Sequence, residues 1–516
     1  MWRIWVVLAI AAACMSPVEA RAFERCDKLF PSIDELRTFV FEAGVRNGPK
    51  KYFDKARSIR IDIDQRPRKI LPAAEFDSNR QPVIIYPAAF PPILCRMALT
   101  TFLIFDGADE QPAAEAASAA AKCLLSGKPR EMCLKDQAYN LERRYRAKFA
   151  ALSAANQRRA YGVALVALGQ IAKHEYAHHL LRHFDRIGSG SIARIDAEFE
   201  ADFYAAVNGI QAGENPGAMY YFFDVMADME AQSEAMRSPD YESGECRARN
   251  INDITALFGV APMMLVDFAA GGGSFQNLEV ELPKVARELA ERDAPKPSAK
   301  SCGRLSEVVL REANAELVSL TALMAEYAHL PGLRRERELA LDEPEVLTLI
   351  KRLEEQGRSF NHIKGLAADV LSHLVQLVGL AGLQAKVSRQ LDAVVESTAD
   401  DILSGDYGRF LKVKALHVLY GSDGPAATRI DAAKTLFESA VTFQPDLSEA
   451  WMNLAMIALT KGDCRKAEEL ADKAARTTAD KDARGQAESF RNGMRGISNP
   501  KRCAEAAARF AETFAR

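Results

Sequence analysis

The chain has 516 residues and carries 67 Lys and Arg against 70 Asp and Glu, a formal net charge of −3 at pH 7. This balance argues against a nucleic-acid-binding protein and against binding to an anionic membrane surface, because both need an excess of basic side chains. The length is enough for about two to four domains.

Residues 1–20 predict a cleaved signal peptide. Arg3 supplies the positive start, and the apolar run at positions 4–15 is too short to span a bilayer. A small-x-small cleavage site ends at Ala20. Lipid attachment at Cys14 is the disfavoured alternative, because no Leu stands three residues before this cysteine. We therefore expect a periplasmic or secreted protein with no transmembrane segment in the mature chain.

Eight cysteines remain once residues 1–20 are removed. An even number in an exported protein indicates disulfides formed in an oxidising compartment. The favoured pairs are local in sequence, Cys123 with Cys133 and Cys464 with Cys503. Buried free thiols are the alternative for some of the eight, and the full connectivity stays open.

The segment Pro82–Pro87 predicts a short β-strand, because β-branched residues fill its centre. Proline at both ends suits an edge strand, where an amide hydrogen is not needed for sheet pairing.

Positions 156–184 contain no proline and repeat apolar residues at helical spacing, which predicts an amphipathic helix. This helix carries the motif H-E-x-x-H as His174, Glu175 and His178. Residues four apart lie on one helix face, so the two imidazoles can bind one Zn²⁺ with Glu175 close to its water. His179 points off that face, and we expect it at the surface.

A second helix is predicted after the glycine-containing turn at positions 188–190. It carries Glu198 and Asp202, again four residues apart and on one face. Hydrolytic zinc sites take three protein ligands, so Glu198 is the candidate third ligand. Asp202 could then accept a hydrogen bond from the second ring nitrogen of a ligand histidine and fix its orientation.

The strings H-E-x-A-H-x-x-x-R-H at 174–183 and E-F-x-A-D at 198–202 resemble the gluzincin metallopeptidases. More narrowly, they are similar to the prenyl-protease/HtpX/BepA-like zinc peptidases, over about residues 80–260. The resemblance implies three zinc ligands: His174, His178 and Glu198. It also implies that Glu175 is the general base, and that Asp202 and His183 support the ligands.

Two features depart from that group. The gap between the motifs is short, and the group's downstream His-Pro plus Arg element is absent. The residue that stabilises the transition state therefore stays open among five candidates: Tyr220, Tyr221, Tyr241, Arg247 and Arg249. Gluzincins commonly bind extended peptide against an edge strand, which would make Pro82–Pro87 a substrate shelf. A purely structural strand is the alternative.

The resemblance and the composition predict the order of domains. A metallopeptidase domain at 21–292 is followed by a linker at 293–303, which holds Pro, Lys and Ser. A helical region at 304–410 comes next, then repeats at 411–480 and C-terminal helices at 481–516. The fold class is mainly α, with an α+β catalytic domain that has a small edge sheet and the H-E-x-x-H helix, followed by an α-helical repeat or bundle region.

The repeats resemble the tetratricopeptide repeat. The residues at repeat positions are Trp451, Leu454, Ala455, Gly462, Ala467 and Ala474. One period upstream, Ala433, Ala440 and Pro445 match. Small residues at these positions let paired helices approach closely.

These observations predict an exported zinc metalloendopeptidase that hydrolyses peptide bonds of proteins, with repeats that bind a substrate or protein partner. Similarity to the BepA-like group implies quality control of envelope proteins. The alternative is a repeat scaffold with a structural or inactive zinc domain. An intact Glu175 argues against that alternative, because a structural site has no use for a base.

Overall fold

The structure is a computed structural model that describes the following residues: 26–66, 71–105, 132–133, 135–136, 138–140, 143, 149, 152–220, 222–223, 244–258, 265, 278–291, 304–328, 343–380, 399–420, 425–478, 481–495, 497 and 500–515. They form helices and one three-stranded sheet, which confirms the predicted mainly α fold class. The expected signal peptide at 1–20, with Cys14, and the expected linker at 293–303 lie outside these residues.

Short helical segments lead into the sheet. Their bounds are α2 Ile33–Phe41, η2 Glu42–Arg46, η3 Lys50–Tyr52 and α3 Phe53–Ser58. The Ser32 side chain caps α2 by accepting a hydrogen bond from the Glu35 amide. The η2 turn is π-helical and its residues Ala43–Val45 are buried, so this turn packs into the interior.

The sheet consists of β1 (Arg60–Asp64), β2 (Ala73–Phe76) and β3 (Pro82–Pro87) in the order β1-β3-β2. Strand β3 pairs parallel with β1 and antiparallel with β2. The prediction that Pro82–Pro87 is an edge strand is therefore wrong. Its prolines occupy the two ends of the strand, so the amides between them stay available for both neighbours. The edge strand nearest the H-E-x-x-H helix is β2.

Helix α7 (Ala154–Leu180) carries the H-E-x-x-H motif through the interior. Ser153 caps its start, accepting a hydrogen bond from the Asn156 amide. The helix ends earlier than expected because Arg182 adopts the left-handed region, with φ of 59°. The short helix α8 (His183–Gly188) follows, and α9 (Arg194–Gln211) then packs against α7.

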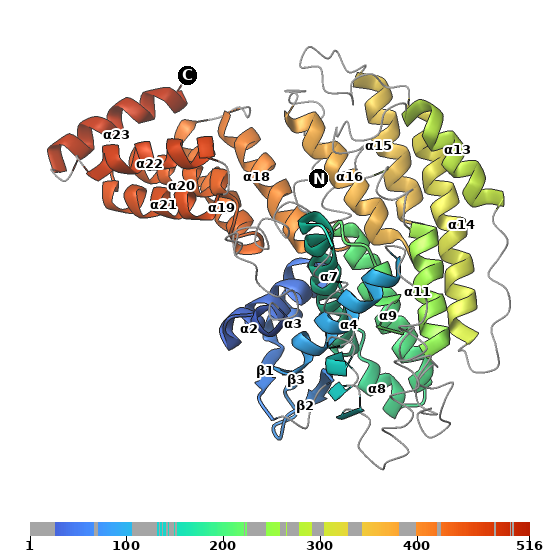
Figure 1. Cartoon of the computed structure of the whole chain (residues 1–516). Helices are drawn as coiled ribbons and strands as arrows, with labels where there is room; N and C mark the ends of the chain where they lie inside the picture. The colour runs from blue at the N-terminus through green and yellow to red at the C-terminus, as the bar shows by residue number, and fades with distance from the viewer. Residues whose placement is uncertain are drawn as a thin grey trace.

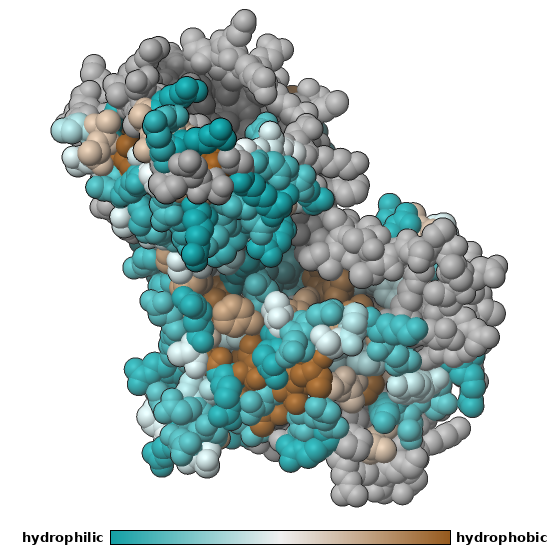
Figure 2. Space-filling view, turned by 90° about the vertical axis from the view of Figure 1, so that its left-hand side faces the viewer, coloured by the Kyte–Doolittle hydropathy of each residue, from teal (hydrophilic) through white to brown (hydrophobic). Residues whose placement is uncertain are grey.

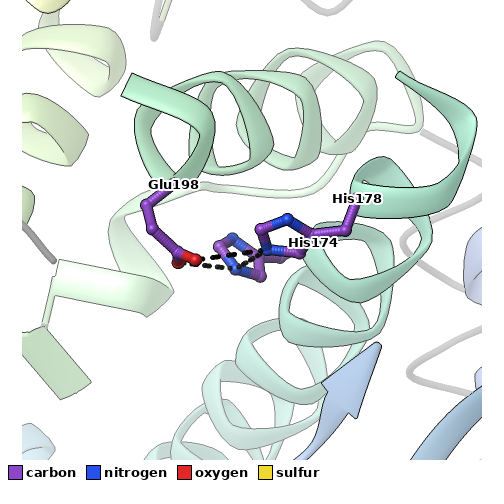
Figure 3. A group of neighbouring side chains, drawn as sticks. All are labelled: His174, His178 and Glu198. Carbon is purple, nitrogen blue, oxygen red and sulfur yellow. Dashed lines mark hydrogen bonds and ion pairs between the residues drawn. The ribbon is translucent and has the colours of Figure 1, made fainter. Parts of the chain in front are cut away.

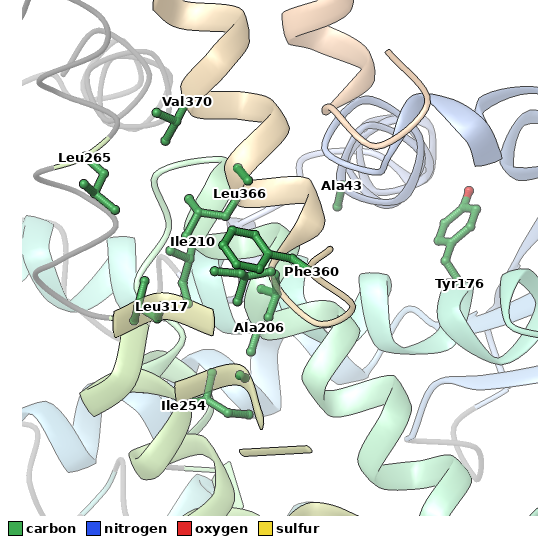
Figure 4. Packing of buried hydrophobic residues seen from close by; sticks show 14 of the residues in the cluster. Ala43, Tyr176, Ala206, Ile210, Ile254, Leu265, Leu317, Phe360, Leu366 and Val370 are labelled. Carbon is green, nitrogen blue, oxygen red and sulfur yellow. The ribbon is translucent and has the colours of Figure 1, made fainter. Parts of the chain in front are cut away.

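Longer helices complete the main body: α4 Phe90–Phe105, α11 Gly244–Phe258, α13 Leu278–Glu291, α14 Arg304–Glu326, α15 Glu343–Gly357 and α16 Lys364–Leu380. Figure 4 shows Ile210 of α9 with Phe360 and Leu366 beside it, and Leu317 of α14 close by. A single hydrophobic cluster includes Leu289 and Leu310, so the core continues across the sequence position of the expected linker.

The C-terminal helices extend to the upper left of Figure 1: α18 Ser404–Tyr420, α19 Ala426–Phe443, α20 Ser448–Thr460, α21 Cys464–Thr477, α22 Lys481–Arg495 and α23 Pro500–Ala515. Helices α18 to α21 each pack against the next one in sequence, and α23 packs against α20. Ala455, Ala467 and Ala474 are fully buried between them, and Gly462 takes a φ of 77° in the turn before α21. Hydrophilic side chains cover the upper part of the face in Figure 2, while hydrophobic residues gather below them.

The C-terminal helices are attached to the N-terminal segment by backbone pairing. The Lys50 amide donates to the Ile402 carbonyl at 2.8 Å, and the Ser404 amide donates to the Gly48 carbonyl at 2.9 Å. An ion pair joins Lys51 to Asp401 at 2.9 Å. Nearby, the Phe53 and Phe443 rings lie 4.5 Å apart. The start of α18 is therefore tied to the main body by residues some 350 positions apart in sequence.

Two disulfides lie within the described residues. Cys464–Cys503 confirms the predicted pair, and Cys26–Cys95 was not foreseen. Cys133 and Cys246 are also disulfide-bonded, but Cys123 and the partners of these two lie outside the described part of the chain. Disulfides fit an extracellular or periplasmic protein. Among the helices that the structure describes, none is both long and apolar enough to cross a bilayer.

We predict that Gly44→Ala lowers the free energy of unfolding by roughly 1–3 kcal/mol, because packed interiors do not accommodate an added methyl group. A Cβ at Gly44 would overlap the Tyr176 ring of α7. Gly188→Ala is the matched control, since nothing lies within 4 Å of a Cβ there. Urea unfolding of both variants measures the difference, and equal midpoints would contradict the close approach of η2 to α7.

Candidate metal centre

Three side chains from two helices converge in the interior. Figure 3 shows His174 and His178 projecting from α7 toward Glu198 on α9. The two Nε2 atoms lie 3.1 Å apart, and the Glu198 carboxylate oxygens lie 3.3 Å from His174 Nε2 and 3.6 Å from His178 Nε2. This group could hold a metal ion, and its members are the three residues that the resemblance implies as ligands.

The ring nitrogen of His174 that faces away from the ligand group, Nδ1, is held by a carboxylate. His174 Nδ1 lies 2.8 Å from Asp202 Oδ1. A carboxylate only accepts, so Nδ1 donates its hydrogen, and Nε2 is the nitrogen at which a metal ion could replace a proton. Arg247 of α11 donates two hydrogen bonds of 2.8 Å to Asp202, and its guanidinium stacks 4.2 Å from the centre of the Phe223 ring. Asp202 therefore accepts from the second ring nitrogen of a candidate ligand histidine, the contact that the sequence suggested. Arg247 stabilises the ionised form of the Asp202 carboxylate.

The outer nitrogen of His178 is held through a longer chain of contacts. His178 Nδ1 lies 3.0 Å from His183 Nδ1, and His183 Nε2 lies 3.1 Å from Glu200 Oε2. Glu200 is also bound by both terminal nitrogens of Arg186. Because Glu200 accepts from His183 Nε2, a neutral His183 accepts at Nδ1 and His178 donates there. The lone pair of His178 Nε2 is then free to face His174 and Glu198.

The donor set fits a small tetrahedral metal ion. Two imidazole Nε2 atoms and one carboxylate face one another, with their hydrogens directed outward to Asp202 and His183. Ligand atoms at 2.0–2.1 Å from a tetrahedral ion lie about 3.3–3.4 Å from each other. The separations of 3.1 Å between the two Nε2 atoms and 3.3 Å between His174 Nε2 and Glu198 Oε2 are close to that spacing, and the other Glu198 oxygen lies 3.6 Å from His178 Nε2.

The electrostatics of the site favour an added positive charge. Burial alone would lower the pKa of His174, but the carboxylates of Asp202 and Glu198 raise this pKa to about 10. Burial, together with the neighbouring His174, lowers the pKa of His178 to about 3. Burial opposes ionisation of Glu198 and Asp202, yet His174 and Arg247 hold the pKa of both carboxyls below its ordinary value. A proton and a metal ion therefore compete for the same nitrogens.

Glu175 lies next to the ligand group but is held from another direction. Its Oε2 accepts a hydrogen bond of 2.7 Å from the Ala74 amide of β2. Burial raises the pKa of Glu175 to about 7. A buried carboxyl with a pKa near neutrality can accept and release a proton at physiological pH.

The structure separates the five candidates for a transition-state stabiliser. Arg247 binds Asp202 and lies 3.9 Å from Glu198 Oε2, so it is directed at the carboxylates. Tyr220 packs against the hydrophobic core. Arg249 lies near Asp253 on α11. Tyr221 and Tyr241 are outside the described residues.

His179 is buried, so the expectation that it lies at the surface is wrong. Its Nε2 lies 3.1 Å from the Val83 carbonyl of β3. Strand β3 covers this side of α7, which periodicity on the helix alone could not indicate.

The sequence did not reveal two groups that hold residues of the site, the Ala74 amide, which binds Glu175, and Glu200, which binds His183. A backbone amide carries no residue signature. Glu200 lies between Glu198 and Asp202 but on another face of α9, and only the fold of α8 brings His183 beside it. Comparison of the chain with protein-family models, curated proteins and solved structures finds no significant match.

The first prediction for this site concerns metal content. We expect the full chain to bind one zinc ion, and the double variant His174→Ala, His178→Ala to bind none, because one carboxylate cannot close the site. Metal analysis after dialysis against trace zinc measures this. Stoichiometric zinc in the double variant would overturn the ligand assignment.

The contact between Asp202 and His174 gives a second prediction, about zinc affinity. Asp202→Asn keeps the size of the side chain but removes the charge that orients His174. We expect zinc affinity to fall by roughly 10- to 100-fold. Asp185→Asn is the control, because Asp185 is exposed and pairs with the exposed Arg182. Equal affinities of the two variants in a chelator competition would remove Asp202 from the metal centre.

Proposed function

We propose that this protein is an exported zinc metalloendopeptidase that hydrolyses peptide bonds of protein substrates. The observation that carries the proposal is the buried carboxylate of Glu175. It lies next to the three candidate metal ligands but is not one of them, because the Ala74 amide binds it. A structural metal site would need a fourth protein ligand and no neighbouring base.

Zinc fits the set of two imidazoles and one carboxylate, which is a common set in hydrolytic sites. His174, His178 and Glu198 would hold it. When bound, the ion supplies Lewis acidity, which polarises a peptide carbonyl and makes water a stronger acid.

Glu175 moves the proton in this proposal. The Ala74 amide holds Oε2, so Oε1 is the oxygen that takes a proton from the attacking water. The same carboxyl then passes the proton to the departing amine. Burial raises the pKa of this carboxyl above its ordinary value, which makes the protonated form needed for the second transfer more accessible.

Asp202 and Arg247 preserve the geometry during these steps. Asp202 accepts from His174 Nδ1 and from Arg247, so it stays ionised and fixes the ring. His183 does the same for His178 through Glu200. The ligand rings are thereby prevented from rotating as the charge on the reacting atoms changes.

The C-terminal helices are proposed as a binding region of the tetratricopeptide type, for a protein substrate or partner. The support is the packing of small buried residues between successive helices, with Ala433, Ala455 and Ala467 fully buried. The disulfides support an exported location. Quality control of envelope proteins remains an implication of the resemblance in the motifs.

The proposal predicts that Glu175→Gln retains zinc but loses cleavage of an unfolded test protein by at least about a hundredfold, because an amide cannot accept the proton. Cleavage is followed by mass spectrometry with zinc content measured in parallel. The control Glu312→Gln changes an exposed carboxylate on α14 that pairs with His362. Unaltered cleavage by Glu175→Gln would refute the mechanism, and absence of cleavage by the unchanged chain would favour the scaffold alternative.

A further inference from the structure

One segment near the N-terminus contacts both the motif helix and the C-terminal helices. Residues 42–52 comprise the π-helical turn η2, a short connection and η3. We call them the bridging segment. Turn η2 packs against α7 and also against α18. Figure 1 shows α18 between the other C-terminal helices and the main body, so the bridging segment meets the C-terminal helices where they begin.

The bridging segment lies against the motif helix at Gly44. A Cβ at Gly44 would come within 2.0 Å of Tyr176 Cδ2, so the backbone approaches this ring as only a glycine can. Tyr176 lies two residues after His174 and two before His178. At about 100° per residue, its side chain points away from the ligand face. The segment therefore supports α7 from the side opposite the candidate ligands.

The same segment lies against α9, which carries the third candidate ligand. A Cβ at Gly48 would lie 3.3 Å from the Tyr204 hydroxyl of α9 and 2.7 Å from the Gly44 carbonyl. The buried hydroxyls of Tyr176 and Tyr204 have no hydrogen-bond partner among the described residues, so packing locates both rings. Packed interiors leave little free space, and a shift of the segment is therefore felt by both helices.

On its other side, the bridging segment pairs with residues 400–404, which lead into α18. The Lys50 amide donates to the Ile402 carbonyl at 2.8 Å. The Gly48 carbonyl accepts from the Ser404 amide at 2.9 Å and from the Ser404 hydroxyl at 3.0 Å. Both Ile402 and Ser404 are fully buried. The junction is therefore a buried backbone pairing between distant parts of the chain.

Charged side chains add to this junction. Lys51 Nζ lies 2.9 Å from one carboxylate oxygen of Asp401, and Nζ of Lys364 on α16 lies 3.2 Å from the other. Burial opposes ionisation of Asp401, but the two ammonium groups hold its pKa below the ordinary value. Removal of the Asp401 charge would leave two cations facing each other, which gives a specific way to loosen the junction.

The two sides of the bridging segment meet at one residue. Gly48 lies against the Tyr204 hydroxyl and gives its carbonyl to Ser404. Metal binding requires one arrangement of α7 and α9, because ligands from both helices must reach the same ion. Departure of residues 400–404 would remove a support from behind both helices. π-Helical turns such as η2 occur frequently at functional sites.

We propose that docking of residues 400–404 on the bridging segment couples the C-terminal helices to the metal centre, so that docking and metal binding stabilise each other. This inference concerns regulation and rests on the candidate metal centre, not on peptidase activity. A partner that bound the C-terminal helices and opened the junction would lower the affinity for metal. By thermodynamic linkage, metal binding would strengthen the junction by the same factor.

The first test uses the unaltered full chain. Hydrogen exchange is followed by mass spectrometry with and without zinc, in peptides that cover residues 48–52 and 400–406. We expect exchange at the junction to slow by at least about fivefold with zinc, the lower end of common coupling between two sites. Peptides from α21, which packs against α20 and α22, are the control and should exchange at an unchanged rate.

Substitutions then test the reverse direction. Asp401→Lys should lower zinc affinity by a similar factor in a chelator competition. Adding Lys51→Glu and Lys364→Glu reverses all three charges and should restore the affinity. Asp431→Lys is the matched control, because Asp431 pairs with Lys461 within the C-terminal region. The melting temperature reports whether each variant is folded, and Lys51→Met replaces Asp401→Lys if the latter does not fold.

Four outcomes overturn the inference: exchange at the junction that zinc does not slow or slows equally in α21, unchanged zinc affinity in folded junction variants, no recovery on charge reversal, or equal loss with Asp431→Lys. Absence of zinc binding by the unaltered chain overturns it together with the ligand assignment. None of these measurements uses cleavage. Coupling without cleavage therefore refutes the peptidase alone, and cleavage without coupling refutes this inference alone.

Discussion

The site depends on the burial of charged groups, which must be paired once water is excluded. Asp202 and Glu198 are almost fully buried, and a buried carboxylate without partners is strongly destabilising. Arg247 supplies the compensating charge from a third helix, α11. Helices α7, α9 and α11 are therefore held in one arrangement by the same interactions that orient the ligand His174.

The two histidines of the motif are supported in different ways. His174 reaches its carboxylate directly, whereas His178 reaches Glu200 through His183. Both arrangements direct a hydrogen outward and a lone pair inward, which is the requirement for metal binding. The second arrangement exists only because α7 ends at Leu180 and the chain turns at Arg182. A continuous helix through Phe184 would carry His183 to a different position.

The sheet contacts the α7 residues next to the candidate metal ligands. The Val83 carbonyl of β3 contacts His179 of α7, and the Ala74 amide of β2 donates to Glu175 of the same helix. Glu175 and the candidate metal ligands of α7 are thus buried beside the sheet. The C-terminal helices begin at a junction that hydrogen bonds and an ion pair tie to Gly48–Tyr52.

The order of residues along the chain determined the parts of the site that obey local periodicity. Residues four apart on a helix share a face whatever surrounds them, so His174 with His178 and Glu198 with Asp202 could be paired from sequence. The close pair Cys464–Cys503 was likewise accessible, as was the mainly helical fold.

Contacts between distant segments depended on the tertiary structure. The central position of β3, the burial of His179, the Ala74 amide on Glu175 and the pairing of Cys26 with Cys95 involve partners that no local pattern specifies. The sequence offered Arg247 as one of five candidates for the residue that stabilises the transition state. The packing of α11 on α9 places its guanidinium against Asp202 instead. The physical reason is that helical and strand periods define which face a residue occupies, whereas the packing of the whole chain decides what covers that face.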